Sequence, residues 1–511
     1  MEVFRNLGIV DKFLEEAFHA LTFNFYNEGQ SVAQFSLDQL DSPYAAIFVL
    51  PQARTEVILG EYLANTYGIK VERNTELLDF ENSQDKVTVN IRKITSNGRE
   101  KMETMQVKYL IGCDGAHSTT RKKLGLQFEG LSIKNRWCFM DVELVTNLPT
   151  RHGFNILWKG GNALLLIPMG NNIYRILIDS DSSNRSHTDY SHEEYIEAAT
   201  SLIAPYTFDV KKVAWFTNFQ VNERKVKEYS QGRVFLCGDA AHIHSPGGGQ
   251  GMNTGIQDAY NLVWKLALIE RNHGDMSILT SSYTKERAPI AVDVLATSGT
   301  ILRTFLSNAS FLSSIRSQIV YTLSSFAFTR STVAQKLVGF AIEYPQGPLT
   351  VPHGGWISQG PTSIKAGRRV PDITFSGWEG KNLHDFFSNP TAFHILVWVP
   401  PTNISKHTAY LEALQCSITK LRNAYEGATP FFETLVITDE RYSDNKVSNS
   451  LLKRNFGSIY YANFDELQVK FGFTHNDPVI LIVRPDGYLG LALYLRNSSQ
   501  ICEYFAPFMN N

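Results

Sequence analysis

Residues 232–253 read GRVFLCGDAAHIHSPGGGQGMN and combine the signals of a strand, a glycine-rich loop and the start of a helix. Val234–Cys237 is an apolar run that suits a buried strand, and Gly238-Asp239 follows at its end. Three successive glycines after Pro246 let the backbone approach a ligand closely. From Gly251 onward, apolar residues recur at helical spacing, so a helix N-terminus with free N–H groups faces the loop. An ordinary glycine-rich turn explains the glycines but not the ordered pattern GDAAHxHxPxxGQGxN.

This pattern resembles the second FAD-binding motif of the flavin-dependent aromatic hydroxylases, the family of para-hydroxybenzoate hydroxylase and phenol hydroxylase. The resemblance implies that Asp239, beside Gly238, holds the ribityl chain of FAD and that Pro246 lies near the flavin ring. It also implies that the first helical residues lie near the N1–C2=O edge of the flavin, where a helix N-terminus stabilises negative charge; these residues are Gly251, Met252 and Asn253. The alternative interpretation is an ordinary turn between a strand and a helix.

A second motif lies upstream, where the apolar segment Val107–Gly112 predicts a short buried strand. It is followed by CDGAHS at residues 113–118 and then by Arg121. The arrangement resembles the DG motif of the same family, which implies that Asp114 and Gly115 serve FAD, with a further role in NAD(P)H binding. An Asp-Gly pair after a strand is by itself a common turn. Arg121 is a candidate phosphate ligand because its guanidinium is a planar fork, or else a solvated residue at a helix start.

Two further segments match the family less specifically. The stretch LPQARTEVIL at residues 50–59 resembles PQxxTExxL, in which the glutamine contacts the cofactor and a helix begins. Gln52 is therefore a candidate FAD ligand, although exposed glutamines are ordinary. The stretch SYTKERAP at residues 282–289 matches YxxERxP, which we interpret as structural.

The N-terminal signature of such enzymes is not present in this chain. The family opens with a strand, a G-x-G-x-x-G turn, a helix and an acidic residue that binds the adenosine ribose. Here residues 1–9, MEVFRNLGI, resemble the helix that follows that turn. We therefore expect about 30 residues or more, one βαβ unit, to be missing. Two explanations are open: a reading frame that begins at an internal methionine, which we favour, or a paralogue that has lost the nucleotide-binding half-site.

Composition narrows the class of protein. A chain of 511 residues with 43% apolar and 19% charged residues is typical of a globular protein with more than one domain. A formal charge of −2 gives no basic field for nucleic acid, and no apolar run long enough predicts a membrane span. The five cysteines are scattered, which favours reduced thiols and a cytoplasmic location. No spacing of histidines or cysteines predicts a metal site.

The predicted fold class is α/β: a Rossmann-like FAD domain, N-truncated, with an inserted β-rich substrate domain and a C-terminal thioredoxin-like domain. We place the first part of the FAD domain at residues 1–125, the substrate sheet at 126–231, and the second part of the FAD domain with helices at 232–345. The last domain is placed at 350–511, where residues 367–372 and 483–488 resemble landmarks of the thioredoxin-like C-terminal domain of phenol-hydroxylase-type enzymes. Within it, residues 393–399 and 434–438 predict parallel strands, and Arg484–Gly487 predicts a hairpin turn. The helical pattern from about 301 to 341 suits core packing or a dimer contact.

The resemblance implies a monooxygenase in which FAD is reduced by NADPH or NADH and reacts with O₂ to give a flavin C4a-hydroperoxide. One oxygen atom then passes to a small aromatic substrate, a phenol above all. A homodimer is the candidate assembly. No residue is identified as the catalytic base, because any choice among 22 tyrosines and 13 histidines would be arbitrary. The alternative is a catalytically inactive, truncated paralogue that acts as a binding or partner subunit.

Overall fold

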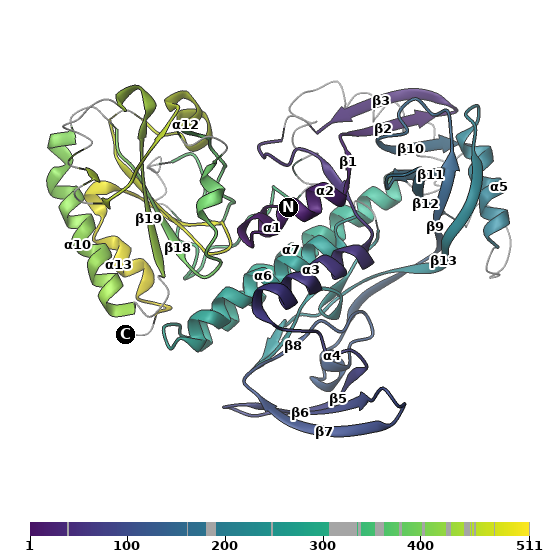
Figure 1. The fold of residues 1–511 in the computed structure, drawn as a ribbon, viewed down its shortest axis with the longest axis horizontal. Helices are drawn as coiled ribbons and strands as arrows, with labels where there is room; N and C mark the ends of the chain where they lie inside the picture. The colour runs from purple at the N-terminus through teal and green to yellow at the C-terminus, as the bar shows by residue number, and fades with distance from the viewer. Residues whose placement is uncertain are drawn as a thin grey trace. The chain divides into compact units, whose positions relative to one another are not determined.

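The computed structural model describes residues 1–37, 40–160, 162–179, 191–246, 249–305, 335, 339–352, 362–377, 381–400, 404–425, 431–443, 450, 452–453, 456–474 and 476–509. The chain forms two compact units. One unit consists of residues 1–10, 257–287 and 341–511, and the other of residues 11–256 and 288–340. The two are described in turn (Figure 1).

An eight-stranded sheet dominates the unit of residues 11–256 and 288–340. Its strand order is β16-β13-β9-β12-β11-β10-β2-β3, and every neighbouring pair is antiparallel except β10 with β2. The strands are β2 (Thr22–Asn27), β3 (Gln30–Ser36), β9 (Glu129–Val145), β10 (Phe154–Lys159), β11 (Asn162–Pro168), β12 (Ile173–Asp179), β13 (Asp209–Lys225) and β16 (His242–Ile243). The predicted β-rich region therefore forms a sheet. It differs from the prediction in taking β2 and β3 from the first segment and β16 from the glycine-rich loop.

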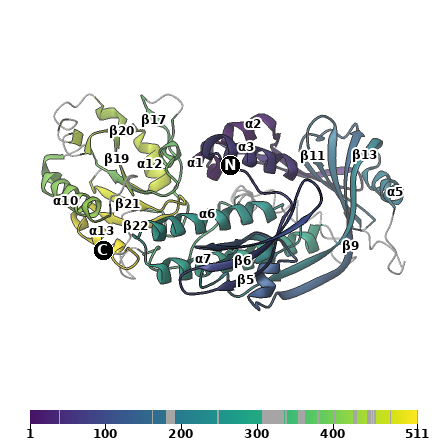
Figure 2. The ribbon, with the colours of Figure 1, turned by 60° about the horizontal axis from the view of Figure 1, so that its bottom comes forward.

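The two faces of this sheet differ because residues alternate along each strand. Helix α5 (His192–Ile203) packs on one face, where Met140 and Ile176 lie in its apolar cluster. Trp137 and Leu177 belong to a separate cluster on the other face. Figures 1 and 2 both show α5 against the side of β9 and β13 that points away from the rest of the unit.

The remaining strands of this unit form three small sheets. They are β1 (Phe18–Ala20) with β4 (Ile47–Val49); the meander of β5 (Thr75–Asn82), β6 (Val87–Ile94) and β7 (Glu100–Val107); and β14 (Ser230–Gln231), β15 (Val234–Leu236) and β8 (Leu110–Gly112). The predicted strand at 107–112 is divided, because Val107 ends β7 and β8 begins only at Leu110. Strand β8 pairs parallel with β15, as expected of a Rossmann-like pair, and is the outer strand of its sheet among the described residues.

Helices α2 (Val10–Glu16), α3 (Gln52–Tyr67) and α4 (Thr119–Lys123) also belong to this unit apart from Val10. Helix α6 (Gly251–Glu270) begins at the glycine predicted to start it, and α7 (Met276–Phe305) follows. The predicted helical stretch from 301 to 341 lies mostly outside the described residues.

The C-terminal part of the other unit is a six-stranded sheet between helices. Its order is β17-β20-β19-β18-β21-β22, with β17 (Phe375–Ser376), β18 (Phe393–Trp398), β19 (Phe432–Asp439), β20 (Ile459–Ala462), β21 (Val479–Val483) and β22 (Leu489–Tyr494). The predicted parallel pair is confirmed as β18 with β19. The predicted hairpin turn is confirmed between β21 and β22, where Gly487 N–H donates to the Arg484 carbonyl over 2.9 Å.

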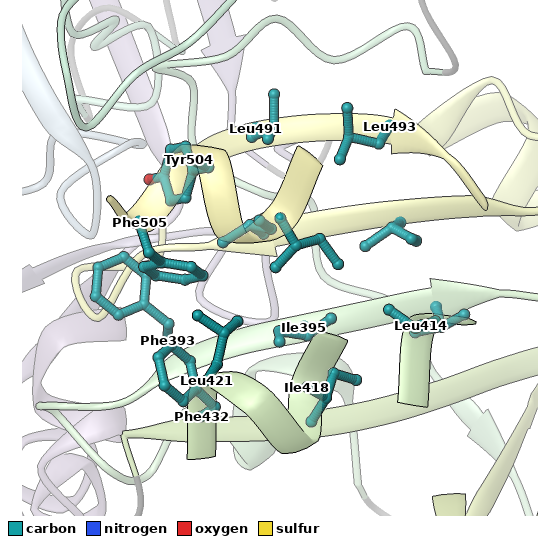
Figure 3. Packing of buried hydrophobic residues seen from close by; sticks show 14 of the residues in the cluster. Phe393, Ile395, Leu414, Ile418, Leu421, Phe432, Leu491, Leu493, Tyr504 and Phe505 are labelled. Atoms are coloured by element: carbon teal, nitrogen blue, oxygen red, sulfur yellow. The ribbon is translucent and has the colours of Figure 1, made fainter. Parts of the chain in front are cut away.

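Alternate residues of this sheet pack against helices on opposite faces. Helices α10 (Thr408–Tyr425) and α13 (Gln500–Phe505) share an apolar cluster with Phe393 and Ile395 (Figure 3). Helix α12 (Phe464–Phe471) shares the second cluster with Leu396 and Trp398. Helix α1 (Glu2–Asn6) joins this unit through ion pairs from Glu2 to Arg369 and from Arg5 to Asp372.

Candidate functional site

The two glycine-containing loops leave neighbouring parallel strands at the same edge. Gly112, the last residue of β8, is in register with Leu236, the last residue of β15, and Cys237 N–H donates to the Gly112 carbonyl over 3.0 Å. Ligands of doubly wound sheets bind at the carboxyl ends of such strands. The structure therefore brings residues 113–118 and the loop that begins at Gly238 together.

Arg121 forms hydrogen bonds to both of these loops. Its Nη1 donates to the Ala240 carbonyl over 2.8 Å and its Nη2 donates to the Ala116 carbonyl over 2.6 Å. The residue is 4% exposed, and its guanidinium carbon lies 3.8 Å from the centre of the Phe128 ring. Burial lowers the pKa of Arg121 below its ordinary value. Two of its donors bind protein carbonyls, so Arg121 positions the loops relative to each other. Its predicted contact with a phosphate group stays a prediction.

Asp114 is engaged within its own loop. Its carboxylate accepts hydrogen bonds from Ser118 Oγ over 2.6 Å, Thr120 N over 2.9 Å and Thr120 Oγ1 over 3.0 Å. Burial acts to raise the pKa of Asp114, but these hydrogen bonds outweigh it and the pKa lies below its ordinary value. Gly115 next to it has a φ of 76°, which suits glycine in a tight turn. Asp114 and Gly115 thus shape the loop, and their predicted contact with the cofactor stays a prediction.

The turn after β15 presents Asp239 to the outside. Gly238 has a φ of 57°, and a methyl group there would lie 3.4 Å from the Cα of Gly255, so the strand end packs against α6 without a side chain between them. Asp239 is exposed, and no hydrogen bond engages its carboxylate within the described part of the chain. A carboxylate with free acceptor capacity at this edge suits the hydroxyl groups of a ribityl chain.

His244 and Ser245 are two residues of this loop that were not among the predicted site residues. Ser245 is fully buried, and its Oγ has no hydrogen-bond partner in the part of the chain that the structure describes. His244 Nδ1 lies 2.9 Å from the Ser245 carbonyl oxygen, whereas its Nε2 is shielded from solvent and also unpaired. The sequence shows the motif H-x-H-S, but it does not show that the Nε2 atom of His244 lacks a hydrogen-bond partner.

The start of α6 completes the loop. The first-turn N–H groups of any α-helix have no partner inside the helix, and here that turn begins at Gly251. Met252 is 42% exposed, and the side-chain amide of Asn253, also exposed, donates to the Gly249 carbonyl over 3.4 Å. Pro246 is half-buried, and its carbonyl accepts from Gly249 N–H over 3.1 Å. The predicted helix N-terminus is thus in place. The contacts predicted between these residues and the flavin stay predictions.

Gln52 is not linked to the two loops by any hydrogen bond among the described residues. It is the first residue of α3, is exposed, and shares no hydrogen bond with either loop in the ranges that the structure describes. Its contact with FAD stays a prediction.

The donors and acceptors of this site fit FAD. Two unpaired buried polar atoms, an exposed carboxylate and a helix N-terminus together suit a ligand with hydroxyl groups and an anionic edge. Within the described residues, no group of three or more histidine, cysteine, aspartate or glutamate side chains could hold a metal ion.

Comparison with known families agrees with this site. Residues 1–298 match the family described as FAD binding domain, and residues 362–511 match the phenol hydroxylase C-terminal dimerisation domain. The chain belongs to the FAD-dependent aromatic monooxygenases. FAD is therefore its cofactor and NAD(P)H its co-substrate, as the motifs predicted. The alternative of a non-catalytic paralogue gains no support from these matches.

Relatives of this monooxygenase family include a phenol 2-monooxygenase of Aspergillus fumigatus. That protein is 25% identical over 99% of this chain and 87% of its own length. The pentachlorophenol 4-monooxygenase of Sphingobium chlorophenolicum is 31% identical over 58% of this chain and 54% of its own length.

Solved structures of monooxygenases share the fold. The flavin-dependent monooxygenase PieE, solved with FAD and substrate, has a TM-score of 0.73 at 19% identity, over 99% of this chain and 90% of its own. The anhydrotetracycline hydroxylase OxyS of Streptomyces rimosus has a TM-score of 0.68 at 23% identity, over 100% of this chain and 89% of its own. No helix among the described residues combines the length and apolar character that a bilayer crossing needs.

Proposed function

We propose that this monooxygenase hydroxylates a phenolic or other electron-rich aromatic ring, with FAD held by residues 113–118, residues 238–246 and the start of α6. NADPH or NADH supplies the electrons and O₂ the oxygen atom. The observation that carries the proposal is the joining of the two loops by Arg121 at the carboxyl ends of β8 and β15. A merely structural turn requires no such link between segments more than 100 residues apart.

Different residues of the site bind different parts of the cofactor. Bound FAD supplies the redox chemistry that activates O₂. The Asp239 carboxylate accepts hydrogen bonds from the ribityl hydroxyl groups, and the first turn of α6 stabilises negative charge on the bound ring. Arg121 and Asp114 keep the two loops in one arrangement, so that this geometry exists before the ligand arrives.

The substrate is proposed to bind on the face of the eight-stranded sheet that α5 does not cover. Phe139 and Phe219 stack there with ring centres 4.9 Å apart, and both are half-buried. Arg175 lies over the Phe139 ring at 5.8 Å and is held by Asp141 through two hydrogen bonds of 2.7 and 2.8 Å. Partly open aromatic side chains beside one neutralised charge pair suit a flat aromatic substrate with polar substituents.

The proposal has a direct test. Purified protein incubated with FAD and freed of excess cofactor should be yellow. It should consume NADPH or NADH faster in the presence of some member of a panel of phenols, with oxygenated product detected by mass spectrometry. FAD-loaded protein that shows neither stimulation nor product with any phenol would contradict the hydroxylase function.

Assembly and location are part of the same proposal. The match to a dimerisation domain over residues 362–511 supports a homodimer, which light scattering after size-exclusion chromatography would detect. The five cysteines all lie in the described residues, and none of them forms a disulfide; they are Cys113, Cys138, Cys237, Cys416 and Cys502. Cysteines outside disulfides support a reducing, cytoplasmic compartment.

A further inference from the structure

The hydrogen bond made by His244 fixes the tautomer of its ring. Its Nδ1 lies 2.9 Å from the carbonyl oxygen of Ser245, and a carbonyl oxygen can only accept. Nδ1 therefore carries the hydrogen and donates it. In the neutral ring, Nε2 is then left with a lone pair and no hydrogen, so it can only accept a hydrogen bond.

Within the residues that the structure describes, no protein group uses that lone pair. Nε2 is shielded from solvent and has no hydrogen-bond partner, and the neighbouring Ser245 Oγ is buried and unpaired as well. The ring edge faces the start of α6, because a methyl group on Gly251 would lie 3.7 Å from both Nε2 and Cε1. Buried polar atoms without partners are uncommon and costly in folded proteins. Two of them side by side in a cofactor loop indicate a ligand that supplies the missing partners.

The groups that act electrostatically on this ring are Asp239 and His242. Burial lowers the pKa of His244 below its ordinary value; the Ser245 carbonyl and Asp239 act to raise it, and His242 acts to lower it. The ring is therefore neutral at pH 7, which is the state in which Nε2 accepts. Asp239, the carboxylate proposed to hold the ribityl chain, precedes His244 by five residues in the same loop.

We propose that His244 is a cofactor-binding residue whose Nε2 accepts a hydrogen bond from a hydroxyl group of the ribityl chain of FAD, beside Asp239. The inference rests on the proposed function, since it needs FAD at this loop. A polyol chain carries several hydroxyl groups in succession, so a carboxylate and a neutral imidazole can each accept from a different one. The hydrogen for this bond comes from the ligand, which the tautomer set by Ser245 requires.

The experiment compares FAD binding by apo-protein of the wild type and of three variants, measured by quenching of flavin fluorescence. His244→Phe keeps a flat ring without the acceptor, and His244→Gln offers an amide oxygen that does not titrate. His192→Phe, on α5 and away from the loops, is the matched control. We expect His244→Phe to weaken binding by about three- to tenfold, the loss of one hydrogen bond of ordinary strength. His244→Gln should stay within about threefold of the wild type, and His192→Phe should match it.

A pH series supplies the second readout. Protonation of Nε2 removes its lone pair, so wild-type affinity should fall as the pH is lowered from 7.5 to 5.5. His244→Gln should show a flatter profile over the same range. Thermal unfolding of the apo-proteins separates binding from folding, because a ligand contact leaves the apo-protein melting temperature nearly unchanged.

The outcomes are distinct. Wild-type affinity in His244→Phe, equal losses in Phe and Gln variants that both melt early, or identical pH profiles would each overturn the role of His244 while FAD binding itself stands. A wild-type protein that binds no FAD would instead overturn the proposed function, and this inference with it.

Discussion

Arg121 offers the sharpest test of how the site is built, because one buried side chain holds both loops. Replacing it with methionine keeps much of its contact with Phe128 but removes the donors to the Ala116 and Ala240 carbonyls. Each hydrogen bond from a charged group contributes about 1.5–3 kcal/mol. Part of that loss is offset because the variant no longer buries a cation, a cost visible in the lowered pKa of Arg121. We therefore expect Arg121→Met to lower the free energy of unfolding by about 2–4 kcal/mol.

The same change should weaken FAD binding by tenfold or more, because the two loops are no longer held in one arrangement. The FAD affinity of Arg121→Lys should lie between those of the wild type and Arg121→Met, since a single ammonium group cannot bind two carbonyls as a guanidinium fork does. The assays are urea unfolding of the apo-protein and fluorescence titration with FAD. Arg92→Met is the control, because Arg92 makes exposed ion pairs with Glu76 and Glu100 that contribute little stability. An Arg121→Met protein with wild-type stability and FAD affinity would refute the reasoning.

Three other predictions follow from the geometry. Asp239→Ala should weaken FAD binding by tenfold or more and leave the fold intact. The reason is that a tenfold change in affinity corresponds to about 1.4 kcal/mol, which is less than one charge-assisted hydrogen bond contributes. Unchanged affinity in a fluorescence titration would mean that Asp239 is only a turn residue. Phe219→Ala should raise the KM for the aromatic substrate more than it changes kcat, since it removes one ring of the stacked pair with Phe139. Steady-state kinetics measure both constants, and an unchanged KM would mean that the substrate binds elsewhere. Glu286 is subject to burial, which acts to raise its pKa, but Arg484 and Lys265 outweigh this and lower the pKa to about 2. Because the folded-state pKa of Glu286 is depressed, its ionisation stabilises the folded state fully above pH 4.5, and this stabilisation is lost as the pH falls toward 2. The contribution to the free energy of unfolding is about 3 kcal/mol. Acid unfolding of Glu286→Gln should lack this pH-dependent contribution.

The sequence predicted the elements that have a strong local signal. The start of α6 at Gly251 follows from helical spacing after a glycine-rich loop, and the β18–β19 pair follows from two apolar runs. The hairpin after β21 follows from Pro-Asp-Gly chemistry at residues 485–487. Each of these features depends on a few neighbouring residues, which is why the order of residues is sufficient to indicate them.

Features that depend on contacts between distant segments were not predicted. The pairing of β2 with β10 adds residues 22–36 to the substrate sheet, and nothing local in TFNFYN distinguishes that partner from another strand. Arg121 was interpreted as a phosphate ligand or a solvated residue, because the sequence cannot show that the Ala240 carbonyl lies within reach. His244 was missed for the same reason: its unpaired nitrogen is a property of packing.

The motifs ERAP at residues 286–289 and RPDG at residues 484–487 show this limit most clearly. Read separately, the first suggested a structural role and the second a turn. In the structure, Glu286 accepts hydrogen bonds of 2.8 Å from both terminal nitrogens of Arg484 and also from Lys265 and Asn261. Arg484 in turn donates to Asp486 over 2.7 Å, and every member of the cluster is buried. Removing one partner from such a cluster strands the opposite charge in the interior, which typically costs about 3–5 kcal/mol. The two motifs therefore act as one element that joins α6 and α7 to the hairpin of the C-terminal sheet, and a substitution in either motif should be read as a substitution in both.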